Sequence, residues 1–213
     1  MTPTSWIRRV GKPAVFVLAL VPLGLLMFNA GAGRLSANPI SDITHTTGIW
    51  TLRFLMFTLA VTPLRRISGQ SWLSRFRRML GLFAFFYGIL HLFTYLYLDQ
   101  FFEWDEILAD IPKRPFITVG FASLVLMMPL AATSFDRVAR AMGGRRWRNL
   151  HRLAYVIALG GVVHFLWLVK ADTSRPHFYG AVFAVLILLR LLDAYAPLMA
   201  RYFGEGRIAA GPR

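Results

Sequence analysis

Long apolar segments constrain the fold of this chain more than any other feature of its sequence. The stretch over residues 149–170 contains one of them, and it carries His151 at its basic entrance and His164 well inside. Each such segment has about 17–20 residues, the length of a helix that crosses a hydrocarbon core about 30 Å thick. The sequence therefore predicts an all-α, multi-pass membrane protein.

Six segments meet this criterion, and they cover residues 14–30, 43–62, 79–98, 116–133, 150–169 and 178–197. We expect residues 14–197 to form one six-helix transmembrane bundle, with residues 1–13 before it and a tail of residues 198–213 after it. The first segment also has the basic and apolar pattern of a signal peptide. The five spans that follow favour a retained first helix.

Composition and charge exclude several classes of cofactor and binding partner. The 213 residues are 56% hydrophobic and include no cysteine, which excludes disulfides, iron–sulfur clusters, thiolate haem ligation and c-type haem attachment. The formal net charge of +14 could suggest nucleic acid. The basic residues lie in short loops between spans, however, where orientation in the membrane explains them better. We expect membrane lipid and no nucleic acid around this chain.

The loops also predict the orientation of the bundle. Basic residues gather before the first span, between the second and third, between the fourth and fifth, and after the sixth. By the positive-inside rule both termini are cytoplasmic. The longest outer loop, residues 99–110, is acidic and aromatic. It is expected to form an interfacial helix or a docking surface for a periplasmic partner with a basic patch.

Two histidines lie at similar depths in the third and fifth spans, which run in the same direction. At 1.5 Å per residue, His91 and His164 are each about 18–21 Å along their helices. A neutral imidazole in hydrocarbon costs free energy unless its nitrogens are satisfied. Two histidines that face each other across two helices provide the axial ligands of a haem iron. We predict a haem b between these spans; the alternative is that both histidines only pack and hydrogen-bond.

A second arrangement lies at the cytoplasmic level. Arg77 precedes His91 by 14 positions, and His151 precedes His164 by 13. The first spacing returns nearly to the same helix face, but the second rotates by about 220°, so a distortion, for example at the glycine pair 160–161, would be needed to align His151. Arg77 is a poor iron ligand and a good partner for a haem propionate. Three alternatives stay open for the group bound at this inner level: a second haem, a flavin and a quinone.

Three further features have both a functional and a structural interpretation. Arg53 lies ten residues into the second span; an intramembrane arginine indicates a site, which a haem propionate or a quinone oxygen would satisfy. His45 and His177, at the outer ends of two spans, are expected to be interfacial. Four glycines could admit a flat macrocycle or simply allow close helix packing: Gly81, Gly88, Gly160 and Gly161.

Three motifs carry a family resemblance. They are RFRRMLGL at residues 75–82, YGILHL at residues 87–92 and WRNLHRLAY at residues 147–155. The chain resembles the MsrQ (YedZ) family, the haem-binding membrane subunits of the bacterial periplasmic methionine-sulfoxide reductase system. It is more distantly similar to the ferric-reductase and NADPH-oxidase membrane domain, in which each of two helices carries a histidine pair. Arg77 departs from that wider pattern.

The resemblance implies an electron-transfer subunit of the bacterial inner membrane with no catalytic residue of its own. Its electrons would come from the quinone pool or a flavin reductase and go to a periplasmic, molybdopterin-containing subunit that reduces methionine sulfoxide. It also implies FMN, for which the sequence has no motif. The 16 residues after the sixth span are too few for a flavin and nicotinamide domain. Alternatives are a ferric or cupric metalloreductase, and a haem-free transporter or scaffold.

Overall fold

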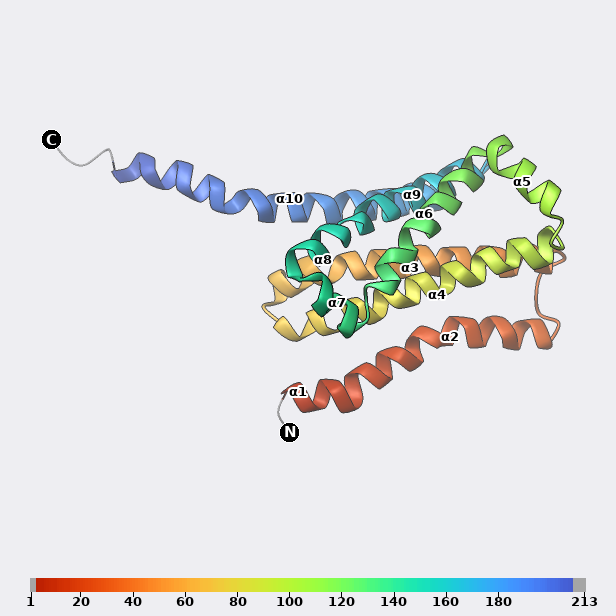
Figure 1. Cartoon of the computed structure of the whole chain (residues 1–213), viewed down its shortest axis with the longest axis horizontal. Coiled ribbons are helices and arrows are strands. Elements are labelled where there is room, and N and C mark those ends of the chain that lie inside the picture. Colours follow the sequence, from red (N-terminus) through yellow and green to blue (C-terminus); the bar gives the residue numbers. More distant parts are fainter. Residues whose placement is uncertain (1–2, 209–213) are drawn as a thin grey trace.

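The structure is a computed structural model that describes the backbone of residues 3–208 and the side chains of residues 5–196 (Figure 1). The described backbone is helical and contains no strand, so the prediction of an all-α protein is confirmed. Residues 1–2 of the predicted N-terminal segment and residues 209–213 of the predicted tail lie outside the described residues.

Six helical segments of the described chain are long and apolar enough to cross a membrane, which confirms the predicted number of spans. Their main helices are α2 (Lys12–Gly31), α3 (Pro39–Ser68), α4 (Arg77–Phe93), α6 (Pro115–Ala132), α9 (Leu153–Leu168) and α10 (Ser174–Ile208). Shorter helices are α1 (Pro3–Trp6), α5 (Trp104–Lys113), α7 (Asp136–Met142) and α8 (Gly144–Leu150). Three irregular helical turns are η1 (Ile7–Gly11), η2 (Ser71–Arg75) and η3 (Thr94–Asp99).

Helix α3 shows how the sequence sets the ends of an element. The side chain of Asn38 caps its first turn, because its Oδ1 accepts a hydrogen bond from the Ser41 backbone N–H at 3.1 Å, and Pro39 occupies the first helical position. Gly69 ends the helix with φ 69°, a left-handed conformation that glycine adopts without steric cost. The helix therefore spans 30 residues between two specific signals.

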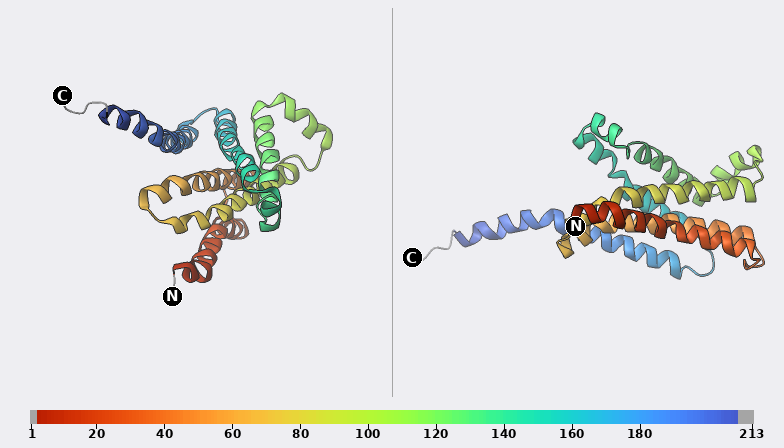
Figure 2. Two further views of the ribbon diagram at one scale, coloured as in Figure 1. Left: turned by 60° about the vertical axis from the view of Figure 1, so that its left-hand side comes forward. Right: turned by 90° about the horizontal axis from the view of Figure 1, so that it is seen from below.

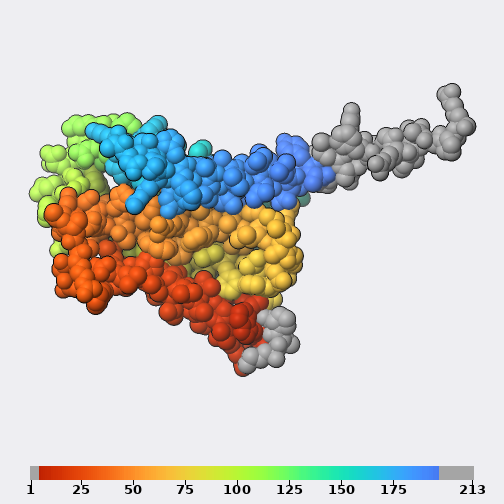
Figure 3. Space-filling model, turned by 180° about the vertical axis from the view of Figure 1, so that it is seen from behind, coloured from red at the N-terminus to blue at the C-terminus, as the bar shows by residue number. Residues whose placement is uncertain are grey.

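The six long helices form a bundle in which α3 lies centrally. Helix α3 pairs with α4, and α6 pairs with α9, while α3 also contacts α9, α10 and α2. Figure 3 shows α2 and α10 at opposite edges of one face, with α3 between them. We call the two ends of the bundle the α5 end and the α7 end; α10 extends past the other helices at the α7 end (Figures 1 and 2).

A tyrosine hydroxyl joins α4 to α2 near Pro22. Tyr87 is almost fully buried, and its hydroxyl donates to the Ala19 carbonyl at 2.8 Å and accepts from the Leu23 backbone N–H at 3.2 Å. Ala19 and Leu23 are the two groups that an undistorted helix would join to each other. The Tyr87 hydroxyl is therefore inserted into the backbone ladder of α2 beside its internal proline, and it satisfies both groups.

The acidic segment after α4 contains α5, which is amphipathic. Ile107 and Asp110 are buried, whereas Trp104 and Leu108 are largely exposed. Asp110 accepts a hydrogen bond from the Tyr95 hydroxyl at 3.2 Å. A short helix of this kind fits the predicted interfacial position. Its role toward a partner and the cytoplasmic position of both termini stay predictions.

Candidate functional site

The structure brings His91 and His164 together near the α5 end of the bundle. The two imidazole rings have their centres 6.0 Å apart, and their planes are at 83°. His91 comes from the last turn of α4, and His164 from the last turns of α9. The equal depth expected from the helix rise is what allows two parallel spans to place these rings side by side.

Each ring is oriented by a backbone carbonyl on a neighbouring helix. The Nδ1 atom of His91 lies 3.0 Å from the Thr44 carbonyl oxygen of α3, and Nδ1 of His164 lies 2.6 Å from the Phe116 carbonyl oxygen of α6. The Thr47 hydroxyl lies 3.4 Å from the same His91 nitrogen. A carbonyl can only accept, so each Nδ1 carries the proton, and each Nε2 keeps its lone pair for a metal.

The pair fits the axial ligands of one iron. Metal–nitrogen bonds of about 2 Å, with the radius of an imidazole added, put the centres of two opposed histidine rings roughly 6 Å apart, which matches the observed 6.0 Å. The Thr44 hydroxyl, which belongs to the residue that binds His91, is buried without a hydrogen-bond partner among the described side chains. A propionate or another acceptor at this place would satisfy it.

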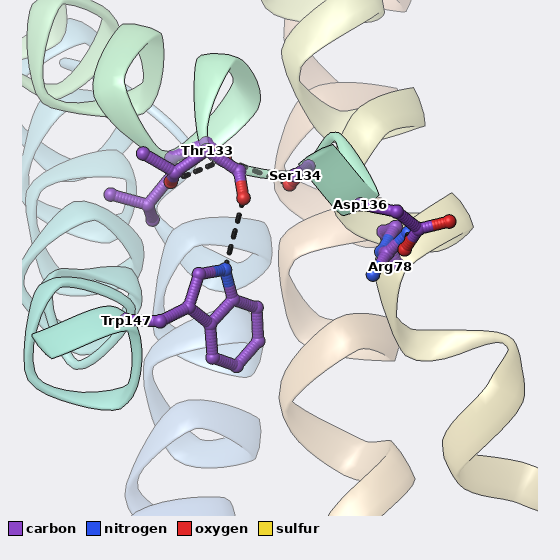
Figure 4. A network of polar contacts seen from close by, with 6 residues as sticks. Arg78, Thr133, Ser134, Asp136 and Trp147 are labelled. Carbon is purple, nitrogen blue, oxygen red and sulfur yellow. Dashed lines mark hydrogen bonds and ion pairs between the residues drawn. The ribbon is translucent and has the colours of Figure 1, made fainter. Parts of the chain in front are cut away.

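His151 lies in a different environment, at the α7 end. Its Nε2 is 3.0 Å from the Thr133 hydroxyl, and its ring stacks on Trp147 with centres 4.0 Å apart. The Trp147 indole N–H donates to the Thr133 carbonyl at 3.0 Å, so α8 is held against the end of α6 (Figure 4). One nitrogen and one face of this imidazole are therefore already engaged.

The helix distortion expected at the glycine pair 160–161 is at another position. Both glycines lie inside α9, and the helix is interrupted between α8 and α9, at His151 and Arg152. The backbone there makes hydrogen bonds between residues three positions apart, as in a turn. The Arg152 N–H donates to the Asn149 carbonyl at 3.2 Å, and the Tyr155 N–H donates to the Arg152 carbonyl at 3.0 Å. The stacking and the hydrogen bond of His151 favour a turn at the histidine itself, so the expected position was wrong.

Basic side chains surround the α7 end. Arg77 lies near enough to His151 and Arg190 for its charge to act on both; a joint site of Arg77 and His151 stays a prediction. The next residue, Arg78, forms an ion pair with Asp136 of α7 (Figure 4). The hydrogen bond and the charge of Arg78 lower the pKa of Asp136 below its usual value of 3.8. The α7 end thus combines an imidazole, a hydroxyl and excess positive charge, which suits an anionic or carbonyl-bearing group.

Two mid-span arginines have partners from the protein. Arg53 donates through Nε to the Tyr179 hydroxyl at 2.9 Å, and its guanidinium lies 4.6 Å from the centre of the Trp50 ring. Arg190 also lies within an apolar run, but it was not among the residues predicted from the sequence. Arg190 donates to the Tyr155 hydroxyl and, at 2.8 Å, to the Leu59 carbonyl. The role of Arg53 toward a cofactor stays a prediction.

The four glycines singled out from the sequence pack against side chains of neighbouring helices. On α4, a Cβ added to Gly81 would meet Thr58, and one added to Gly88 would meet Leu124 and Thr51. On α9, a Cβ added to Gly160 would meet Ser123 and Val119, and one added to Gly161 would meet Leu52 and Leu55. Two other glycines, Gly48 and Gly120, lie against the rings of His91 and His164.

The side chains of His45 and His177 are exposed.

Comparisons with known proteins agree with this fold. Residues 47–162, just over half of the chain, match the family described as "Ferric reductase like transmembrane component". This range includes most of α3, all of α4 and α6 and most of α9, and it ends two residues before His164. The fold and the match together define a ferric-reductase-like transmembrane domain.

Two relatives are similar over most of their length. A protein of Herminiimonas arsenicoxydans is 51% identical over 186 residues, which cover 86% of this chain and 85% of the relative. A protein of Ralstonia nicotianae is 50% identical over 213 residues, which cover 99% of this chain and 95% of the relative. Both bear the name "Protein-methionine-sulfoxide reductase heme-binding subunit MsrQ". The chain belongs to the MsrQ family.

Proposed function

We propose that this protein is a b-type cytochrome of the bacterial inner membrane. In this proposal, residues 14–197 form the electron-transfer domain, with both termini in the cytoplasm. Its electrons come from the quinone pool or a flavin reductase. They go to a periplasmic, molybdopterin-containing methionine-sulfoxide reductase that repairs oxidised proteins. The names of the relatives and the match to the ferric-reductase-like family support this assignment.

The observation that carries the proposal is the geometry of His91 and His164. Their rings are 6.0 Å apart, and each Nδ1 lies at hydrogen-bond distance from a backbone carbonyl. These carbonyls hold the rings in one orientation and increase the basicity of Nε2, which is how histidine ligands of metals are normally supported. A haem with two histidine ligands has no open coordination position and supplies one-electron transfer.

In this proposal, His151 and Arg77 serve the donor side. Oxidation of a quinol or a reduced flavin releases protons, and an imidazole at this level can accept one of them. Arg77 supplies a positive charge for an anionic oxygen, a propionate or a phosphate. The hydroxyl of Thr133, at 3.0 Å from His151, fixes the orientation of the ring for this task. FMN, the quinone and a second haem are the three candidate groups for this donor-side site.

A dithionite-reduced minus oxidised spectrum, with haem quantified per chain, tests the proposal. The wild-type protein should show a sharp b-type band, and His91→Ala or His164→Ala should each abolish it. His177→Ala is the matched control, because His177 is an exposed histidine whose Nδ1 also lies near a carbonyl, that of Thr173, at 2.6 Å. A full spectrum in either ligand variant would refute the pair. Colourless wild-type protein after haem supplementation would favour a transporter or scaffold.

A further inference from the structure

The two helix pairs of the bundle present their histidines in the same way. In the α3–α4 pair, the carbonyl of Thr44 lies 3.0 Å from Nδ1 of His91. In the α6–α9 pair, the carbonyl of Phe116 lies 2.6 Å from Nδ1 of His164. Each carbonyl lies in the first turns of its helix, and each histidine lies near the end of the helix that packs on it. In both helix pairs, therefore, a backbone carbonyl near the start of one helix binds Nδ1 of a histidine near the end of the other.

A glycine lies against each ring, four positions after the carbonyl that the ring binds. A Cβ atom on Gly48 would lie 3.0 Å from Cε1 and 3.1 Å from Nδ1 of His91. On Gly120 it would lie 2.5 Å from Nδ1 and 2.9 Å from Cε1 of His164. Contacts under 3.0 Å essentially never occur for real Cβ atoms. Any side chain at position 120 would therefore displace the ring, and position 48 is at the limit.

The backbone itself does not require glycine at these two positions. Gly48 and Gly120 lie inside α3 and α6, and neither has a positive φ. Glycine is a poor helix former, so its presence needs another reason. In a helix, the carbonyl of residue i accepts from the N–H of residue i+4, whose side chain leans back over that carbonyl. Glycine at i+4 leaves the carbonyl accessible to a donor from outside the helix; at Thr44 the imidazole shares the oxygen with the Thr47 hydroxyl, which lies 3.0 Å from it.

We propose that Gly48 and Gly120 are positioning residues for the two axial ligands. Each glycine gives the imidazole room to reach a backbone carbonyl that a side chain would otherwise cover. The glycine thereby fixes the tautomer of the ring and the direction of its plane, with the two planes at 83°. The assignment of the rings as ligands rests on the proposed function. The contacts between the glycines and the histidines are made within the protein and do not depend on that assignment.

The first experiment compares Gly48→Ala and Gly120→Ala in the full-length, haem-loaded protein. Two controls are matched: Gly24→Ala, where a Cβ meets nothing within 4 Å, and Gly81→Ala, where the nearest atom is a methyl carbon of Thr58 at 3.7 Å. The readouts are haem per chain and the ferric low-spin EPR spectrum. The controls should match wild type in both readouts.

The two variants should differ in severity because their contacts differ. Gly120→Ala should weaken haem retention by about 10-fold or more, as loss of a ligand's supporting hydrogen bond commonly does. Gly48→Ala should keep the haem but shift the EPR spectrum, from the type given by perpendicular imidazole planes toward the type given by parallel planes. Wild-type haem content and spectra in both variants would overturn the positioning role. If His91→Ala and His164→Ala themselves keep the haem, the proposed function fails instead.

A second experiment separates positioning from general packing. Thermal unfolding of the full-length chain is measured for Gly120→Ala in the wild-type and in the His164→Ala background, with the haem content recorded beside each Tm. In the wild-type background the substitution should lower Tm. In the His164→Ala background it should leave Tm unchanged or raise it, because alanine is the better helix former and the ring is gone. An equal loss of Tm in both backgrounds would overturn the proposal.

Discussion

The α5 end and the α7 end of this bundle, which are the outer and inner levels in the proposed orientation, use the same residue type in opposite ways. At the outer level, His91 and His164 face each other, and backbone carbonyls of two other helices orient them. At the inner level, His151 faces no other imidazole among the described side chains, and it binds the Thr133 hydroxyl and stacks on Trp147. Main-chain acceptors hold a ring at a fixed place, whereas hydroxyl partners can exchange donor and acceptor roles. The outer level suits a permanent ligand pair, and the inner level suits a group that gains and loses protons.

The largest expected effect comes from comparing substitutions at the two levels. His164→Ala should remove the b-type spectrum, because the iron loses one of its two proposed axial ligands. His151→Ala should keep about one haem per chain. It should slow reduction of that haem by a quinol analogue about 100-fold, the usual contribution of a positioned proton acceptor. The measurements are haem per chain and stopped-flow reduction at the b-type band.

This comparison can fail in two informative ways. Loss of half the haem in His151→Ala, from a wild-type content near two per chain, would make His151 a ligand of a second haem. An unchanged rate of reduction would remove His151 from the donor side altogether. His177→Ala is a suitable control, since this exposed histidine lies in the first turn of α10.

The next effect concerns the two partly buried arginines, Arg190 and Arg53. Arg190 donates to the Leu59 carbonyl at 2.8 Å, and Pro63, four residues later in α3, has no N–H to offer that carbonyl. Arg190 therefore satisfies a backbone group that the proline leaves unpaired within the membrane. Arg190→Met should lower the free energy of unfolding by about 1–3 kcal/mol. Arg53→Met, which loses the Tyr179 hydroxyl and the face of Trp50, should cost about 1 kcal/mol.

A double-mutant cycle checks this explanation of Arg190. In a Pro63→Ala background the Leu59 carbonyl regains a helical donor, so Arg190→Met should cost less there than in the wild-type background. Thermal or denaturant unfolding in detergent gives the four values. Equal costs in both backgrounds would show that Tyr155, and not the carbonyl, determines the effect of Arg190.

The sequence predicted the parts of this site that depend on regular helix geometry. The length of the apolar segments predicted six spans, and the rise of a helix put His91 and His164 at one depth, where the structure places their ring centres 6.0 Å apart. The sequence did not reveal the carbonyls of Thr44 and Phe116, because every residue of a helix has a carbonyl and only tertiary packing selects one. Gly48 and Gly120 were missed for the same reason.

Other differences have local causes. The distortion was expected at residues 160–161 because paired glycines weaken a helix, but those glycines are held by close packing on α3 and α6. The break occurs at His151, where side-chain partners compete with the helix. Arg190 carried the same signal as Arg53, an arginine in an apolar run, and could have been found from the sequence.

A smaller effect is expected at the hydroxyl that binds His151. Thr133→Val removes the hydroxyl at 3.0 Å from Nε2 and keeps the Thr133 carbonyl that accepts from Trp147. We expect a loss of about 1 kcal/mol in the free energy of unfolding, slower haem reduction and an unchanged b-type spectrum. Thr133→Ser, which keeps the hydroxyl, is the control. A changed spectrum in Thr133→Val would mean that the two levels are not independent.

The smallest effect is expected at the surface of the inner level, where Arg78 joins α4 to α7 through Asp136. Because Arg78 lowers the pKa of Asp136 in the folded protein, the ion pair stabilises the folded state fully above the ordinary carboxyl pKa of 3.8. This contribution is lost as the pH falls through the lowered value. Asp136→Asn should therefore reduce Tm slightly at neutral pH and make no difference at the most acidic pH that the protein tolerates. Since both side chains are exposed to solvent, high salt should also remove the effect. A difference in Tm that persists in acid and in high salt would show that Asp136 holds α7 by contacts other than this ion pair.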